Sequence, residues 1–358
     1  MAAASPWIWN ARLDLAAFWL PAAIAIGLSL IAPKLGIRGE LPPWAWLAFV
    51  VAIDVAHVHT TLFRTYFDKE ELAKRKAFYA LLPVGVYALG VLLHAESRIL
   101  FWRVLAYAAV FHFVRQQVGW VAICRARAGE RDRAGRLFDE LVIYAVTIYP
   151  VLYWHANIPR AFHWFVDDDF IPWPELAPAI YWLQFVYGSL LAAYAVRESW
   201  LWHRRRFTSW SKHTVVFSTA LLWYVGIVGQ NNDFTFTLTN VVGHGVPYGV
   251  LLWMYTKERA RDAESTVITG VVRLGVGAFL ATVLVLALAE EALWDRLIWH
   301  ERPWLFGGQR SETPLHSPWF QTLIVPLLSV PQATHYALDA FLWRRKDTNR
   351  AQAAALGF

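Results

Sequence analysis

Long apolar stretches alternate with short polar segments along almost the whole chain. Several of these stretches approach 20 residues, which is the length at which a helix crosses the hydrocarbon core of a bilayer. The pattern predicts an all-α protein: a polytopic transmembrane helical bundle that forms a single domain. We expect about ten spans, at residues 15–33, 43–63, 77–95, 99–124, 138–157, 176–200, 214–231, 235–256, 267–290 and 317–343.

The connecting segments alternate in charge. Arg- and Lys-rich segments follow every second span, whereas the segments between them carry few cations. The positive-inside rule therefore predicts that both termini are cytoplasmic, and the even number of spans agrees with that orientation. The location we expect is a bacterial inner membrane. The basic segments contain Arg64, Lys69, Lys74, Arg75 and Lys76; Arg125, Arg127, Arg131, Arg133 and Arg136; Arg204, Arg205, Arg206 and Lys212; Lys257, Arg259 and Arg261; and Arg344, Arg345 and Lys346.

Histidines are the most informative polar residues within the spans. Ionisable groups inside a bilayer are costly and usually line an interior site. Most of these histidines have a polar neighbour three or four residues away, on the same helix face. A histidine that is steered by a carboxylate or an amide is typical of a metal ligand. The histidines are His57, His59, His112, His244 and His335, and the pairs are Asp54 with His57, His112 with Gln116, Asn240 with His244, and His335 with Asp339.

The predicted topology places these histidines at similar depths. All five lie on even-numbered spans, which run from outside to inside. His57 precedes the first cation of its basic segment by seven residues, His335 by nine, and His112 and His244 by thirteen each. At about 1.5 Å per residue, they lie roughly 10 to 20 Å from the cytoplasmic boundary. Four helices can therefore bring imidazoles to one level in the inner half of the bilayer.

The first motif, Asp54-Val-Ala-His57-Val-His59, contains two histidines that point in different directions. Two residues correspond to about 200° around a helix, so both cannot face one metal ion on a regular helix. We favour His57 as the ligand, because Asp54 and Thr61 share its face. His59 serves a second metal ion or bonds to a neighbouring helix.

The second motif, from Phe111 to Gln117, places His112, Arg115 and Gln116 in the inner part of its span. A knot of hydrogen bonds between helices is the alternative to a functional site here. A buried guanidinium needs an anion, and Asp54, Asp339 or a substrate headgroup would supply one to Arg115.

The third motif surrounds His244, which is flanked by Gly243 and Gly245 and followed by Pro247. The glycines allow close backbone approach, and the proline removes a helical hydrogen bond. A broken helix is tolerated in a membrane where it lines a buried cavity, so we expect a break here. The alternative is a packing kink with a histidine whose hydrogen bonds are satisfied.

The fourth motif is a polar stripe formed by Gln332, His335, Tyr336 and Asp339 on an otherwise apolar helix. It is the densest stripe of this kind in the chain. We expect Asp339 to be a metal ligand or the orienting partner of His335, and Tyr336 to shuttle a proton. Together, the motifs predict metal ligands at His57, His59, His112, His244, His335, Asp54 and Asp339, and candidate catalytic side chains at Arg115, Gln116 and Tyr336.

Composition narrows the class of protein further. The chain is 57% hydrophobic and 16% aromatic with 21 Trp, far more than a soluble domain of 358 residues needs. Its single cysteine, Cys124, excludes thiolate-rich metal sites. The net charge of +6 lies mostly in the connecting segments, which indicates contact with the lipid bilayer and no nucleic-acid binding.

Neutral imidazoles with one or two carboxylates suit iron, zinc or copper, and the missing thiolates argue against Cu(I). In its arrangement of histidines, the chain resembles integral-membrane histidine-rich oxygenases and desaturases, including the bacterial β-carotene dioxygenases. That resemblance implies non-haem iron and an oxygenase or desaturase reaction. The buried position and the aromatic content favour a hydrophobic substrate, such as an acyl chain, a sterol or an isoprenoid, and we also expect an electron-donor protein as a partner. The HxxxH and HxxHH boxes of the desaturases are absent.

Four alternatives stay open. A zinc hydrolase of lipid amides or esters uses nearly the same ligands. A proton-coupled transporter also buries His, Asp and Arg, although the halves of this chain show no clear inverted repeat. A haem-binding electron carrier would use His112 and His244. A scaffold or assembly factor would leave the histidines dispersed in space.

Overall fold

The computed structural model describes residues 4–37, 39–262, 266–307, 317–343 and 349–358. The regular structure within these ranges is helical and contains no strand, as the sequence predicts. The first half contains α1 (Ala11–Asp14), η1 (Leu15–Trp19), α2 (Leu20–Ile31), η2 (Ala32–Leu35), α3 (Pro43–Ala45), η3 (Trp46–Val55), α4 (Ala56–Thr60), η4 (Thr61–Arg64), α5 (Lys69–Lys74), α6 (Lys76–Glu96), α7 (Arg98–Arg127) and α8 (Arg133–Ala156). The second half contains η5 (Pro174–Leu176), α9 (Ala177–Arg205), α10 (Trp210–Trp223), η6 (Tyr224–Gly229), α11 (Asp233–Asp262), α12 (Thr266–Leu274), α13 (Val276–Trp294), η7 (Asp295–Trp299), α14 (Pro303–Phe306), α15 (Pro318–Leu328), α16 (Val330–Leu342) and α17 (Arg350–Ala355).

Six helical segments of the described chain are long and apolar enough to cross a membrane. They indicate a multi-pass membrane protein, and each coincides with one of the ten spans expected from the sequence. They are Ala11–Leu35, Pro43–Arg64, Lys76–Glu96, Arg133–Ala156, Pro174–Arg205 and Val276–Trp299.

The other four expected spans are helical but do not meet the same criterion. They correspond to α7, to α10 with η6, to α11, and to α15 with α16. Three of these four segments carry site histidines. Polar residues around His112 and His244 reduce the apolar character of α7 and α11, whereas α15 and α16 are each shorter than a span and are separated at Ser329. The total of ten spans therefore stays a prediction. His316 and the last basic segment, at residues 344–346, lie outside the described residues.

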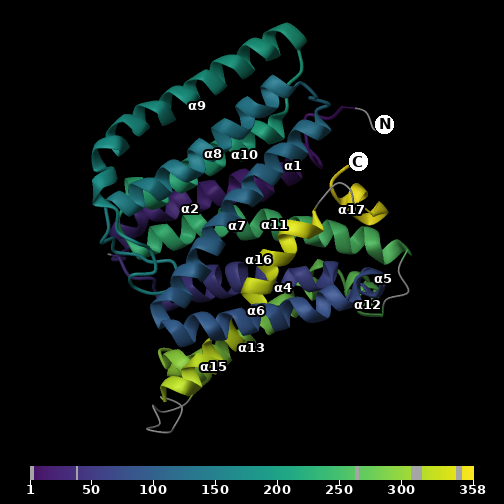
Figure 1. Cartoon of the computed structure of the whole chain (residues 1–358). Helices are drawn as coiled ribbons and strands as arrows, with labels where there is room; N and C mark the ends of the chain where they lie inside the picture. The colour runs from purple at the N-terminus through teal and green to yellow at the C-terminus, as the bar shows by residue number, and fades with distance from the viewer. Residues whose placement is uncertain (1–3, 38, 263–265, 308–316, 344–348) are drawn as a thin grey trace.

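Helix α11 lies at the centre of the bundle, where it packs against α2, η3, α10 and α17 (Figure 1). Helix α7 contacts α6, α8, α10 and α16, so that α7 and α11 together connect the two halves of the molecule. Helix α9 forms one edge of the bundle and α15 the opposite edge (Figure 1). The elements that carry the predicted site are therefore the interior ones.

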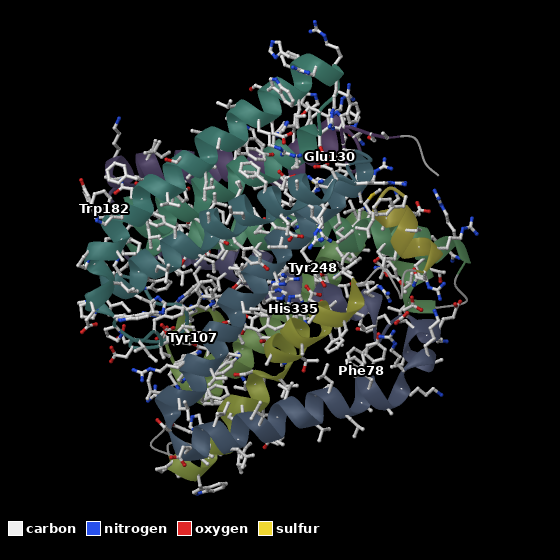
Figure 2. All side chains as sticks on the ribbon, turned by 45° about the horizontal axis from the view of Figure 1, so that its top comes forward. Phe78, Tyr107, Glu130, Trp182, Tyr248 and His335 are labelled. Carbon is white, nitrogen blue, oxygen red and sulfur yellow. The ribbon has the colours of Figure 1, made fainter. Side chains whose placement is uncertain are left out.

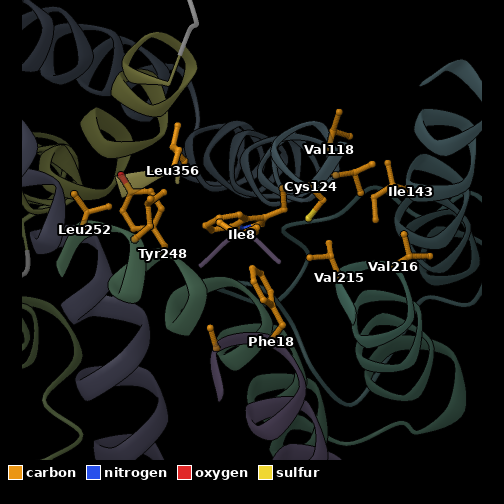
Figure 3. Close-up of a cluster of buried hydrophobic side chains, with 14 of the residues drawn as sticks. Ile8, Phe18, Val118, Cys124, Ile143, Val215, Val216, Tyr248, Leu252 and Leu356 are labelled. Carbon is orange, nitrogen blue, oxygen red and sulfur yellow. The ribbon is translucent and has the colours of Figure 1, made fainter. Parts of the chain in front are cut away.

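The largest hydrophobic core joins segments that are far apart in the sequence (Figure 3). Ile8 and Phe18 from the N-terminal segment pack in the same cluster as Val118 of α7 and Leu356 near the C-terminus. The indole of Trp9 also donates a hydrogen bond of 2.7 Å to the carbonyl of Ala355. Both ends of the chain are thus tied to the helices that form the site.

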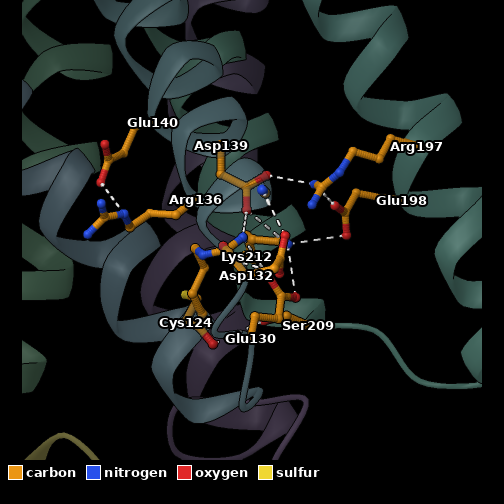
Figure 4. A network of polar contacts seen from close by, with 12 residues as sticks. Cys124, Glu130, Asp132, Arg136, Asp139, Glu140, Arg197, Glu198, Ser209 and Lys212 are labelled. Atoms are coloured by element: carbon orange, nitrogen blue, oxygen red, sulfur yellow. Dashed lines mark hydrogen bonds and ion pairs between the residues drawn. The ribbon is translucent and has the colours of Figure 1, made fainter.

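A network of buried ions connects α7, α8, α9 and α10 (Figure 4). The ammonium group of Lys212, with no exposed area, lies 2.8 Å from Glu130, 3.3 Å from Asp139 and 3.3 Å from Glu198. Arg125 pairs with the same Asp139. Buried charges are costly unless they are paired, so this ion network holds the ends of the four helices in one arrangement.

Candidate metal centre

Four histidines from four different helices meet inside the bundle: His57 on α4, His112 on α7, His244 on α11 and His335 on α16. Each offers one ring nitrogen, and these nitrogens all lie within 4.8 Å of one another. None of the four is more than 5% exposed. His335 lies in the middle of the molecule (Figure 2). The structure thus brings together four of the five histidines that the sequence places within the spans; these four form the histidine cluster.

A close approach between α11 and η3 brings His244 to His57. A Cβ atom on Gly245 would lie 2.8 Å from the side chain of Ile53 and 3.2 Å from its carbonyl oxygen. Only glycine permits this separation, and the Nε2 atoms of the two histidines lie 2.9 Å apart. The close approach expected at this glycine is present, but the expected break is not. Helix α11 continues through Pro247, because neighbouring groups can compensate for one missing helical hydrogen bond.

Aromatic rings fix the planes of two of the imidazoles. Phe113 stacks on His244 with ring centroids 3.6 Å apart and an angle of 11° between the planes. Tyr336 stacks on His112 with centroids 4.8 Å apart and an angle of 30°. These contacts surround the cluster with apolar surface and limit the rotation of its ligating atoms.

A chain of hydroxyl groups orients His335. Its Nδ1 atom lies 2.7 Å from the hydroxyl of Thr61, which in turn lies 3.1 Å from the hydroxyl of Tyr248. Tyr248 donates a hydrogen bond of 2.5 Å to Asp339. The hydrogen bond at Nδ1 directs Nε2 of His335 toward the other imidazoles, as is usual for a histidine that binds a metal ion. Thr61 follows His57 by four residues and Tyr248 follows His244 by four. This helical spacing is the signal in the sequence that both hydroxyl groups lie on the faces that carry the histidines.

The donor set fits a transition-metal ion. Nε2 of His335 and Nε2 of His112 are buried and make no hydrogen bond within the described part of the chain. Leaving a buried nitrogen without a partner costs about 1–3 kcal/mol, and a metal ion would remove that cost at several nitrogens together. Metal–nitrogen distances of about 2.1 Å place opposite ligands about 4.2 Å apart, so a contraction of about 0.6 Å would suffice.

The two predicted carboxylate ligands lie just outside the histidine cluster. Asp54 is 3.6 Å from Nδ1 of His57, and Asp339 is 3.8 Å from Nε2 of His112. Asp339 does not contact Nδ1 of His335 directly, because the hydroxyl of Thr61 occupies that position, but Tyr248 and Thr61 connect the two residues. Asp54 and Asp339 are therefore placed to balance the charge of a bound cation and to polarise the imidazoles.

His59 does not belong to the cluster. Its Nε2 atom lies 2.9 Å from a carboxylate oxygen of Glu290 on α13. Because α4 is a regular helical turn, the rings of His57 and His59 point in different directions, as their spacing of two residues predicts. Glu290 is nearly buried and close to the site, whereas its position near the end of an apolar stretch indicated only the outer interface.

A cavity of about 560 Å³ adjoins the cluster and is lined in part by His112, Tyr336 and Asp339. The predicted catalytic side chains Arg115 and Gln116 also line it. Arg115 forms no ion pair with either predicted aspartate within the described residues, because its exposed side chain turns outward and donates to the hydroxyl of Tyr144. Tyr336 receives a hydrogen bond of 2.7 Å from Gln332.

Comparison with known proteins adds no relative: no family model matches the chain, and no curated protein or solved structure matches it either. The class of protein defined by the fold and the site is a multi-pass helical membrane protein with a buried cluster of four histidines.

Proposed function

We propose that this protein is a membrane-embedded, iron-dependent oxygenase or desaturase-like enzyme that acts on a hydrophobic lipid or isoprenoid. The observation that carries the proposal is the convergence of four buried imidazoles beside a cavity of substrate size. Two of the four come from α7 and α11, long helices that are less apolar than the six candidate spans. Polar groups placed at such cost inside a bundle indicate a function.

The number of imidazoles favours iron over zinc. Tetrahedral zinc with four protein ligands has no open position, which is typical of a structural site. Iron accepts more than four ligands, so the four histidines would hold it without filling its coordination sphere. Bound iron would supply the activation of dioxygen. A zinc-dependent hydrolase would need one of the four histidines to dissociate.

The geometry disfavours haem. A haem between His112 and His244 would need the space between their rings for its macrocycle. Their ring centroids lie 4.9 Å apart, with His57 4.5 Å from His244 and His335 4.7 Å from His112. Rings this close to one another leave no space for a macrocycle between them.

The residues of this chain have separable roles in the proposal. The four cluster histidines would hold the metal ion, and Thr61 would fix the tautomer of His335. Tyr248 and Asp339 hold one proton between them in a hydrogen bond at the edge of the cavity, next to Tyr336. The apolar walls would bind the substrate and exclude water. We further propose ten spans with both termini cytoplasmic, a bacterial inner membrane as the location, and an electron-donor protein on the cytoplasmic side.

Elemental analysis with an optical spectrum tests the proposal on detergent-purified protein. We expect one iron per chain, lost in His335→Ala and retained in His203→Ala, whose ring is exposed on α9. Zinc in place of iron would favour the hydrolase, and a Soret band would identify haem. A chain that binds no metal ion even after reconstitution would contradict all three.

A further inference from the structure

A second cavity, of about 1060 Å³, adjoins the one beside the histidine cluster. The two cavities share Gly119, Ile123 and Trp343 in their walls. The inner cavity reaches His112, and the outer one reaches Arg127 at the end of the same helix. At about 1.5 Å per residue, the path along α7 is about 22 Å long.

The walls of the two cavities differ in chemistry. Aromatic and aliphatic side chains dominate the inner cavity, including Phe111, Trp120 and Leu251. The outer cavity is lined by several arginines. One of them, Arg125, is neutralised by the ion network. Three more arginines, Arg127, Arg131 and Arg136, line the same cavity, where Glu140 lies 3.8 Å from Arg136, so that four arginines outnumber the two glutamates, Glu130 and Glu140, in its wall.

We propose that the substrate is an anionic amphiphile: a single long hydrocarbon chain that ends in a carboxylate or a phosphate. Its chain lies in the inner cavity beside the histidine cluster, and its charged end binds to the arginines of the outer cavity. This inference rests on the proposed function for the reaction, but the binding itself does not need the metal ion. Guanidinium groups suit both anions because they donate hydrogen bonds in pairs.

The arrangement also selects the position of reaction. The binding of the charged end to the arginines sets how far the hydrocarbon chain of the substrate reaches toward His112. The carbon atoms next to the histidine cluster are therefore interior ones, away from the charged end. Arg115 is the only arginine or lysine in the lining of the inner cavity. An anion bound to Arg115 would place its charge beside the histidine cluster, because only three positions of α7 separate Arg115 from His112.

Gly119 provides the sharpest test, because it lines the junction of the two cavities and no heavy atom lies within 4 Å of a Cβ placed on it. Leucine at this position would block the junction without a clash and would favour the helix. Gly188→Leu is the matched control, since a Cβ there also meets open space and the residue lines neither cavity. Ile123→Trp narrows the same junction from another position.

The experiment measures the binding of radiolabelled oleate, oleyl phosphate and oleyl alcohol to the full chain in a neutral detergent. We expect the two anions to bind at least tenfold more tightly than the alcohol. Gly119→Leu and Ile123→Trp should weaken anion binding at least tenfold, and Gly188→Leu should not. The double variant Arg131→Gln/Arg136→Gln should remove the preference for an anion and leave the binding of the alcohol unchanged. A preference for one of the two anions identifies the headgroup.

Three results would overturn the inference. The first is equal binding of oleate and oleyl alcohol, and the second is unchanged anion binding in both junction variants. The third is an anion preference that is lost in Arg115→Gln but kept in Arg131→Gln/Arg136→Gln. Oleate binding that persists in His335→Ala supports the inference even if the metal-dependent function fails. If the protein contains iron but does not bind oleate, the proposed iron-dependent function stands and this substrate class is rejected.

Discussion

The Nε2 atoms of His57 and His244 lie 2.9 Å apart although 187 positions separate the two residues in the sequence. At this distance one imidazole N–H donates to the ring nitrogen of the other, and two ligands of one metal ion would lie about as close. The separation depends on the backbone contact between Gly245 and Ile53. The position of a single glycine thus connects the packing of α11 to the geometry of the site.

Gly245→Ala should therefore impair the metal centre. The added methyl group would press on the carbonyl oxygen of Ile53, which cannot rotate away, and overpacking of this kind costs about 1–3 kcal/mol. We expect a lower unfolding temperature and weaker metal binding, measured by thermal unfolding and elemental analysis. Gly249→Ala is the control, because a Cβ there meets open space. Equal metal content and stability in the two variants would contradict the role given to Gly245.

Thr61→Val should weaken metal binding without unfolding the protein. Valine keeps the shape of threonine but removes the hydroxyl 2.7 Å from Nδ1 of His335. Loss of such an orienting partner usually lowers metal affinity 10- to 100-fold. Competition with a chelator measures the change, and Thr61→Ser should restore most of the affinity. Unchanged affinity in Thr61→Val would show that His335 is oriented by packing alone.

The sequence predicts much of this site because helical spacing and charge bias are both local signals. Spacing identifies the face shared by His57 and Thr61, and the basic segments indicate a common depth for the histidines. Which helices are neighbours in the membrane plane depends on contacts between distant segments, which no local pattern contains. Glu290 was missed for this reason: only the packing of α13 against α4 brings it to His59. The partner of Arg115, Tyr144, was not predicted, because periodicity does not show which neighbouring helix a side chain faces.

Lys212→Met should destabilise the protein strongly. The change leaves the buried carboxylates of Glu130, Asp139 and Glu198 without the ammonium group between them. Removing one partner from a buried ion network costs about 3–5 kcal/mol. Arg136→Gln is the control, because its pair with Glu140 is exposed and such pairs contribute less than about 1 kcal/mol. Denaturant unfolding should separate the two variants clearly, and similar midpoints would contradict this account of the ion network.

Asp68 should make stability depend on pH. Burial alone would raise the pKa of this carboxyl, but hydrogen bonds from Arg259 and Tyr255 outweigh burial and hold its pKa below the ordinary value of 3.8. A carboxyl whose pKa is lowered by folding contributes stability above its unfolded pKa, and that contribution disappears as pH falls through the folded pKa. Asp68→Asn should therefore be less stable than the unmodified protein near neutral pH, by about 3 kcal/mol.

That difference should shrink below about pH 4, as the carboxyl of the unmodified protein becomes protonated. Thermal unfolding of both proteins at several pH values measures it. Glu301→Gln is the control, because that side chain is 61% exposed beside Arg302. A difference between Asp68→Asn and the unmodified protein that does not change with pH would indicate that shape, and not charge, matters at this position.

His59→Ala should keep the full metal content, in contrast to alanine variants of the four cluster histidines. His59 points toward Glu290, and its ring is directed away from the cluster by its position on α4. If the site holds one ion, the variant loses an ion pair between α4 and α13 and becomes less stable while its iron content is unchanged. If His59 and Glu290 bind a second ion, the metal content falls from two per chain to one. Glu290→Gln then gives the same loss, because both side chains would be ligands. Metal counting on the three proteins therefore separates a mononuclear centre, which the geometry favours, from a dinuclear one.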